Sequence, residues 1–143
     1  MKWARRHWPI LTAILLVAIG VVAIYNLREK WAAAKRDTAY RTALHSYSEV
    51  LGPGMTRKEV EDYFRVNKTY FREMCCVDHR SIKRSWDDLV KIGQENPPWF
   101  CDAKNIYVAF QFSDAPAHDE RLARDPSDKL TAITLYPWLE GCL

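Results

Sequence analysis

An uninterrupted apolar segment near the N-terminus constrains this chain more than any other feature. Residues 8 to 27 carry no formally charged side chain, and between Pro9 and Tyr25 the only polar groups are the hydroxyls of Thr12 and Tyr25. A helix of these 20 residues is about 30 Å long, which matches the hydrocarbon core of a bilayer. We therefore predict a transmembrane helix over residues 8 to 27, preceded by a short basic cytoplasmic tail at residues 1 to 7.

The flanks of this segment favour an uncleaved signal anchor. Arg28, Glu29 and Lys30 stand where a signal peptidase would need small residues,. Cleavage of a signal peptide and burial as a soluble core helix are the alternatives. Aromatic rings suited to the two membrane interfaces border the segment at Trp3, Trp8, Tyr25 and Trp31,.

The net charge of +3 belongs to the membrane flank. Residues 1 to 27 hold three basic and no acidic residues, and the rest of the chain holds 18 basic and 18 acidic residues. A neutral remainder does not favour a nucleic-acid-binding face. We expect the lipid bilayer as a partner through residues 8 to 27, with no nucleic acid and no evident small-molecule substrate.

The four cysteines all follow the apolar segment, at Cys75, Cys76, Cys101 and Cys142. An even number in a short domain favours disulfides and therefore an oxidising compartment. Neighbouring residues on a strand point to opposite faces, so we expect Cys75 and Cys76 to reach Cys101 and Cys142 rather than each other. The exact pairing stays open. The basic residues on the two sides of the apolar segment do not fix its orientation in the membrane. We therefore use the cysteines, and predict a single-pass protein of the inner (cytoplasmic) membrane whose C-terminal domain lies outside the cytoplasm.

An enzyme or a metal site is the competing interpretation of the same residues. Cys76 and His79 have the C-x-x-H spacing, with Cys101 and Cys142 available as further ligands, and His79 and His118 have acidic neighbours,. Structural zinc sites usually use paired ligands, and no phosphate loop, H-E-x-x-H helix or G-x-S-x-G elbow occurs,. We assign no catalytic residue, no cofactor and no metal, and keep a small membrane-tethered hydrolase or metal-dependent enzyme as the alternative.

Two helices are predicted between the membrane and the rest of the domain. Residues 28 to 51 are rich in alanine, lack Gly and Pro, and gather apolar side chains on one face in their second half, which predicts a helical stalk merging into the first domain helix,. Gly52-Pro53-Gly54 ends it. Thr56 and Glu59 form a T-x-x-E capping box, which predicts a second helix ending near residue 66 or 67,.

Four segments downstream have the composition of strands, and turn-forming residues separate them. In residues 106 to 112 apolar side chains alternate with others, which is typical of a half-buried strand,. We predict an α+β fold in residues 52 to 143, with two helices packed on one face of a roughly four-stranded antiparallel sheet. The predicted strands are Thr69 to Val77, Asp88 to Gly93, Ile106 to Phe112 and Leu130 to Tyr136.

Trp99 and Phe100 follow two prolines and precede Cys101. They are interpreted either as part of the core beside Cys101 or as an exposed ridge that contacts a partner. Because Trp is usually highly buried, we expect the core position.

The segment from Gly54 to Val60, followed by Tyr63 and Phe64, resembles the G-M-T-x-x-E-V-x-x-L-L segment of the small protein A or outer-membrane lipoprotein A family, the BamE-like domains. That family shares a fold with the β-lactamase-inhibitory proteins. The chain departs from it in its transmembrane anchor, which replaces a lipid-modified cysteine, and in its four cysteines. The resemblance implies an envelope module that binds another envelope or membrane protein; a structural subunit of a membrane complex is a further alternative.

Overall fold

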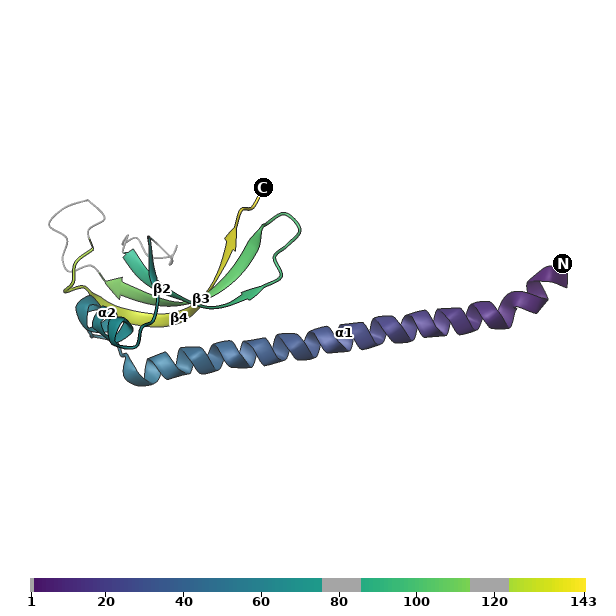
Figure 1. Ribbon diagram of the computed structural model, residues 1–143, viewed down its shortest axis with the longest axis horizontal. Coiled ribbons are helices and arrows are strands. Elements are labelled where there is room, and N and C mark those ends of the chain that lie inside the picture. The colour runs from purple at the N-terminus through teal and green to yellow at the C-terminus, as the bar shows by residue number, and fades with distance from the viewer. Residues whose placement is uncertain (1, 76–85, 114–123) are drawn as a thin grey trace. The chain divides into compact units, whose positions relative to one another are not determined.

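The computed structural model describes residues 2 to 75, 86 to 113 and 124 to 143, with the backbone alone for residues 2 to 11 and for Cys75. The chain divides into two compact units, Met1–Ala39 and Tyr40–Leu143. The described elements are, in chain order, two helices followed by four strands; Figure 1 shows the ribbon that they form. This is the predicted α+β fold.

The first unit is helical throughout. Helix α1 covers Lys2–Val50, 49 residues in all, and so includes the predicted membrane segment and the predicted stalk. By length and composition α1 can cross a membrane, and none of its apolar stretch is buried in the protein. Apolar side chains that face outward all around a helix, such as Leu16 at 68% exposure, match a lipid environment and not a soluble core,. The prediction of a helix long and apolar enough to cross a membrane is confirmed.

Helix α2, Arg57–Val66, begins at the predicted capping box. The Thr56 N–H donates to Glu59 Oε2 at 2.7 Å, and the Glu59 N–H donates to Thr56 Oγ1 at 3.2 Å. The donated hydrogen bonds from Thr56 hold the pKa of Glu59 below its usual value,. Two backbone N–H groups that a helix start leaves without partners are thereby satisfied.

The sheet is antiparallel throughout, in the order β1, β2, β3, β4. The central strands are β2, Trp86–Glu95, and β3, Ala103–Ser113; the edges are β1, Arg72–Cys75, and β4, Lys129–Glu140. The turn before α2 adds to the start of β4, where the Gly54 N–H donates to the Leu130 carbonyl at 2.8 Å.

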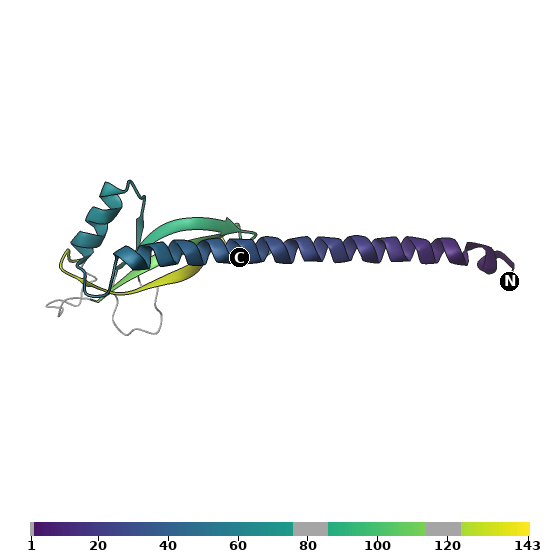
Figure 2. The same ribbon diagram turned by 90° about the horizontal axis from the view of Figure 1, so that it is seen from below.

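The core lies between one face of the sheet and the two helices. The end of α1 and the whole of α2 cover this same face (Figures 1 and 2). Three aromatic rings meet at its centre: Phe64 lies 4.8 Å from Phe110 and 6.3 Å from Tyr47, between ring centroids. The buried members of the core are Leu51, Val60, Phe64, Val90, Val108, Phe110, Phe112 and Leu130. Ile133 and Leu135 are partly buried and pack against this cluster.

Gly93 shows why the sheet and α1 approach so closely. A β-bulge lies between Lys91 and Gly93, and a Cβ atom added to Gly93 would lie 2.5 Å from Cε1 of Tyr40 on α1. Glycine leaves room for that ring, so a side chain at this position would displace the Tyr40 ring from the sheet,.

Strand boundaries differ from those predicted, for physical reasons. β1 begins at Arg72, later than predicted, because the Thr69 N–H still donates to the Phe64 carbonyl of α2 at 2.8 Å, after a turn through Lys68 with φ 53°. β4 continues past the predicted end at Tyr136 through Pro137 to Glu140, which an edge strand tolerates because a proline there removes no inner ladder bond,. β3 is buried on both faces, not half-buried: Tyr107 and Ala109 pack with Leu89 in a second cluster on the other face.

Candidate binding surface

The turn that joins β2 to β3 presents the most exposed aromatic side chain of the described part of the domain. Trp99 is 93% exposed and Phe100 is 39% exposed. Their ring centroids are 5.7 Å apart and their planes nearly perpendicular, at 86°. The expectation that these two residues belong to the core is therefore wrong. Cys101, at 8% exposure, occupies the buried position of this segment instead. We call Trp99 and Phe100 the aromatic tip.

The backbone of the aromatic tip is fixed by short-range contacts. Pro97 and Pro98 restrict the chain just before Trp99. The Cys101 N–H donates to the Pro98 carbonyl at 3.0 Å and closes a turn that directs Trp99 outward. The Phe100 carbonyl accepts from the Leu143 N–H at 3.0 Å, which ties the tip to the segment after β4. A turn whose backbone is held in this way loses little backbone conformational entropy when it binds.

A disulfide between Cys101 and Cys142 secures the base of the tip. Ala103 is paired with Glu140 in the β3–β4 register, and the same antiparallel register extended by two residues places Cys101 opposite Cys142, with Cα atoms 4.0 Å apart. Gly141 adopts φ +61°, and a Cβ atom there would meet Asp102 Oδ2 at 2.0 Å. Glycine therefore lets the chain turn back toward Cys101.

This pairing corrects the expected connectivity. Cys101 and Cys142 bond to each other, so neither can bond to Cys75 or Cys76. The prediction failed because it considered where neighbouring cysteines on one strand point, whereas the β3–β4 register decides which cysteines meet. Cys76 lies outside the described residues, and the structure gives only the backbone of Cys75, in β1.

The described residues do not form the catalytic or metal site that the alternative enzyme interpretation requires. His79 and His118 lie outside them. The sulfur atoms of Cys101 and Cys142 are joined to each other and therefore not available as metal ligands or nucleophiles,. Among the described residues, no group of three or more His, Cys, Asp or Glu side chains is placed to hold a metal ion.

Two pairs of oppositely charged side chains lie near the tip, and the exposed carboxylate of Asp102 lies beside them. Lys104 Nζ lies 2.8 Å from Glu95 Oε2, and Arg72 Nη2 lies 3.2 Å from Glu140 Oε1. Each of these pairs is neutral as a whole. The tip therefore offers aromatic surface as its main means of contact, which suits a protein surface with an apolar pocket.

The second face of the sheet also carries aromatic side chains, but these already contact one another. Tyr136 and Trp138 lie 5.9 Å apart between ring centroids, and the Arg72 guanidinium lies 4.8 Å from the centre of the Tyr107 ring. Burial raises the pKa of the Tyr107 hydroxyl and of the Tyr136 hydroxyl. A partner would gain less from these partly buried rings than from Trp99.

The free edge of β4 is the other conceivable binding element, since an added strand would pair there. Gly54 and Met55 already bond to its first part, at Leu130. Pro137 lies in its second half and has no N–H to offer,. Only a short stretch is left for strand addition, so this edge is a poorer candidate than the aromatic tip.

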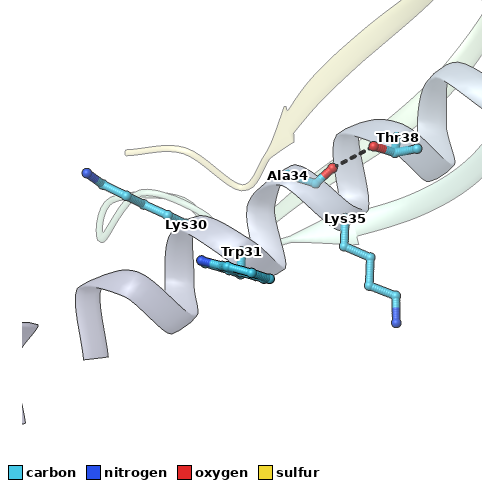
Figure 3. Close-up of a pocket in the computed structure, with 5 residues that line it drawn as sticks. All are labelled: Lys30, Trp31, Ala34, Lys35 and Thr38. Atoms are coloured by element: carbon cyan, nitrogen blue, oxygen red, sulfur yellow. Dashed lines mark hydrogen bonds between the residues drawn. The ribbon is translucent and has the colours of Figure 1, made fainter. Parts of the chain in front are cut away.

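Five residues of α1 line a shallow depression, drawn in Figure 3. Lys30 and Lys35 extend away from each other in this view, and the Thr38 hydroxyl donates to the Ala34 carbonyl at 3.0 Å. Trp31 is 77% exposed. No polar groups converge on a common point, so the depression is not built as a ligand site; a Trp here suits a membrane interface.

Comparison with known proteins identifies no protein similar to this chain. No family model, no curated protein and no solved structure matches this chain. The assignment of a binding surface therefore rests on the geometry of the domain itself.

Sequence reasoning missed a cluster of charged side chains buried at the end of the sheet far from the tip. The Arg57 guanidinium, 1% exposed, places Nη1 3.0 Å from Asp88 Oδ1 and Nη2 3.2 Å from Asp128 Oδ2. It also donates to the Trp86 carbonyl and covers the Phe112 ring, with Cζ 4.0 Å from the ring centre. Arg57 thus ties α2 to β2 and to the turn before β4. A signal was present in the sequence: Arg57 has the helical spacing of Val60 and Phe64, which are buried.

The Cys101–Cys142 disulfide gives a prediction for stability. Replacing both residues in the Cys101→Ser/Cys142→Ser variant is expected to lower the free energy of unfolding by about 2 to 4 kcal/mol, because the bond restricts the unfolded chain. Urea unfolding of the full chain in detergent, followed by near-UV circular dichroism, measures the loss. A thiol reductant is expected to destabilise the wild type more than the double variant. Equal stability of the two oxidised proteins would contradict the prediction.

Proposed function

We propose that this chain is a membrane-anchored protein-binding module of the bacterial cell envelope, and that it contacts its partner through the aromatic tip. The observation that carries the proposal is Trp99, 93% exposed on a turn held by a disulfide. Large aromatic side chains on rigid turns dominate the energy of protein interfaces. An isolated domain gains nothing from keeping such a side chain in water.

The proposed location combines the anchor with the disulfide. α1 supplies a helix of membrane-spanning length, and disulfides persist in oxidising compartments. We infer a single-pass inner-membrane protein with the domain on the extracytoplasmic side. The resemblance of the segment from Gly54 to Phe64 to BamE-like domains supports an envelope partner, and no catalysis is assigned.

The proposal predicts a large effect of one side chain on binding and none on folding. Trp99→Ala is expected to weaken partner binding about 30-fold, which corresponds to about 2 kcal/mol. Its free energy of unfolding is expected to stay within about 0.5 kcal/mol of the wild type, because the ring is exposed. Tyr70→Ala is the matched control, since Tyr70 is another aromatic residue, 84% exposed, outside the tip.

Site-specific photo-crosslinking in intact cells identifies the partner and tests the surface. A photoreactive phenylalanine analogue is placed at position 99 in one variant and at position 70 in another. A discrete crosslinked product is expected from position 99 and not from position 70, and the compartment of the captured protein then tests the proposed topology. Identical products from both positions, or none from position 99, would contradict the aromatic tip as the contact surface.

A further inference from the structure

The buried charged cluster of Arg57, Asp88 and Asp128 at the start of α2 continues outward into partly exposed charged side chains, and carboxylates outnumber arginines in the whole group. Besides Arg57, Asp88 and Asp128, a second arginine lies close by: Arg124 Nη1 is 2.6 Å from Glu73 Oε1, and its Nη2 bonds to Glu61. In the described residues, two guanidinium groups thus face four carboxyl groups, which come from α2, β1, β2 and the turn before β4.

Asp88 is the carboxylate of this cluster whose loss of hydration is least offset by hydrogen bonds. It is fully buried on β2, at 0% exposure. Its Oδ1 accepts from Arg57, while its buried Oδ2 has no hydrogen-bond partner among the described residues. An ionised carboxylate in such a place has lost its hydration on one oxygen without a replacement. A proton on Oδ2 would lower that cost and remove the repulsion from Glu61 and Glu73, at the expense of part of the attraction to Arg57,.

We propose that Asp88 acts as a proton-sensitive latch: in mildly acidic surroundings it is protonated and holds α2 and the start of β4 to β2 more firmly than when it is ionised. The cluster lies at the end of the sheet opposite the aromatic tip, because β4 begins beside it at Lys129 and ends beside the tip at Glu140. The latch therefore controls the stability of the domain and is separate from the proposed contact surface.

The electrostatics of the surrounding groups agree with this assignment. Burial raises the pKa of Asp88 from 3.8 to about 7; the arginines Arg57 and Arg124 oppose the rise, while Glu61 and Glu73 add to it,. Because the folded protein then holds a proton that the unfolded chain releases, stability from this group is complete below about pH 4 and is lost as the pH rises through about 7,.

The test compares the pH dependence of unfolding for the full chain in detergent with that of the Asp88→Asn variant, which cannot titrate. The measured quantity is the folding equilibrium constant of the wild type divided by that of Asp88→Asn. This ratio is expected to fall by up to about tenfold per pH unit between pH 5 and 7 and to become constant above pH 8. Titrating histidines affect both proteins alike and cancel in the comparison. Asp62→Asn serves as the control: Asp62 lies on the surface of α2, and hydrogen bonds from Lys58 and Arg65 hold its pKa below the usual value, so its removal leaves this pH range unchanged.

A direct titration keeps the proposal testable even if Asp88→Asn does not fold. Carboxyl ¹³C chemical shifts of the wild-type protein are expected to show one aspartate that titrates close to neutral pH. Parallel stability curves for wild type and Asp88→Asn between pH 5 and 8.5, or titration of every aspartate below pH 5, would overturn the latch.

Discussion

At pH 8, where Asp88 is ionised in the wild type, replacing Arg57 by alanine is expected to lower the free energy of unfolding by about 3 to 5 kcal/mol, the range for breaking a buried ion pair from one side. The substitution leaves Asp88 and Asp128, both at most 2% exposed, without their common partner. It also removes the guanidinium that covers Phe112. Urea unfolding of the full chain in detergent, with unchanged m-value, measures the loss.

Two further variants separate the contributions to this loss. Arg65→Ala on the same helix removes a cation whose side chain is 74% exposed and paired with Asp62, so it is expected to cost less than about 1 kcal/mol,. Arg57→Met keeps an apolar stem over Phe112 but leaves the carboxylates unpaired, so the difference between Arg57→Met and Arg57→Ala reports the packing of the stem. A loss below about 1 kcal/mol for Arg57→Ala would show that water or another group replaces the guanidinium.

Local sequence signals predicted the helices well because each has a short-range cause. Thr56 and Glu59 satisfy each other's backbone N–H groups within one turn, so α2 begins where the capping box begins. Gly52 to Gly54 end α1 because residues that disfavour helix interrupt the backbone ladder. The four strands were also located, since alternation and turns are properties of a few consecutive residues.

Features that depend on pairing between distant residues were not predicted. The Cys101–Cys142 bond follows from the β3–β4 register, and no local pattern encodes which residues of two strands lie opposite each other. Trp99 was placed in the core because its side chain is apolar, but the turn closed by Pro98 and Cys101 directs it outward. In both cases the geometry of the hairpin outweighs the preference of the single residue.

Arg57 is a different case, because the sequence did contain its signal. It precedes Val60 by three residues and Phe64 by seven, which places all three on one face of α2. No role was predicted for this cation, although a cation on a buried face indicates a buried acidic partner. Asp87 and Asp88, two acidic residues at the start of a predicted strand, offered that partner.

Phe64→Ala is expected to cost about 3 to 5 kcal/mol of unfolding free energy, because it deletes the ring at which both helices and the sheet meet. Phe64 is 0% exposed, and its ring centroid lies 4.8 Å from that of Phe110 in β3 and 5.2 Å from that of Phe71 before β1. The same denaturant experiment measures the loss. It should appear in the transition midpoint and not in the m-value if the unfolded state is unchanged.

The controls for Phe64 lie within the same helix. Val66→Ala changes a residue that is 81% exposed and is expected to shift the free energy by less than about 0.5 kcal/mol,. Phe64→Leu keeps most of the apolar volume and is expected to lose less than Phe64→Ala, since the residual cavity is smaller. If Phe64→Ala behaved like Val66→Ala, α2 would not be held by its apolar face, and the Arg57 ion pairs would have to fix the helix to the sheet alone. Comparing the losses in Phe64→Ala and Arg57→Ala therefore decides whether apolar packing or the buried ion pairs hold α2 on the sheet.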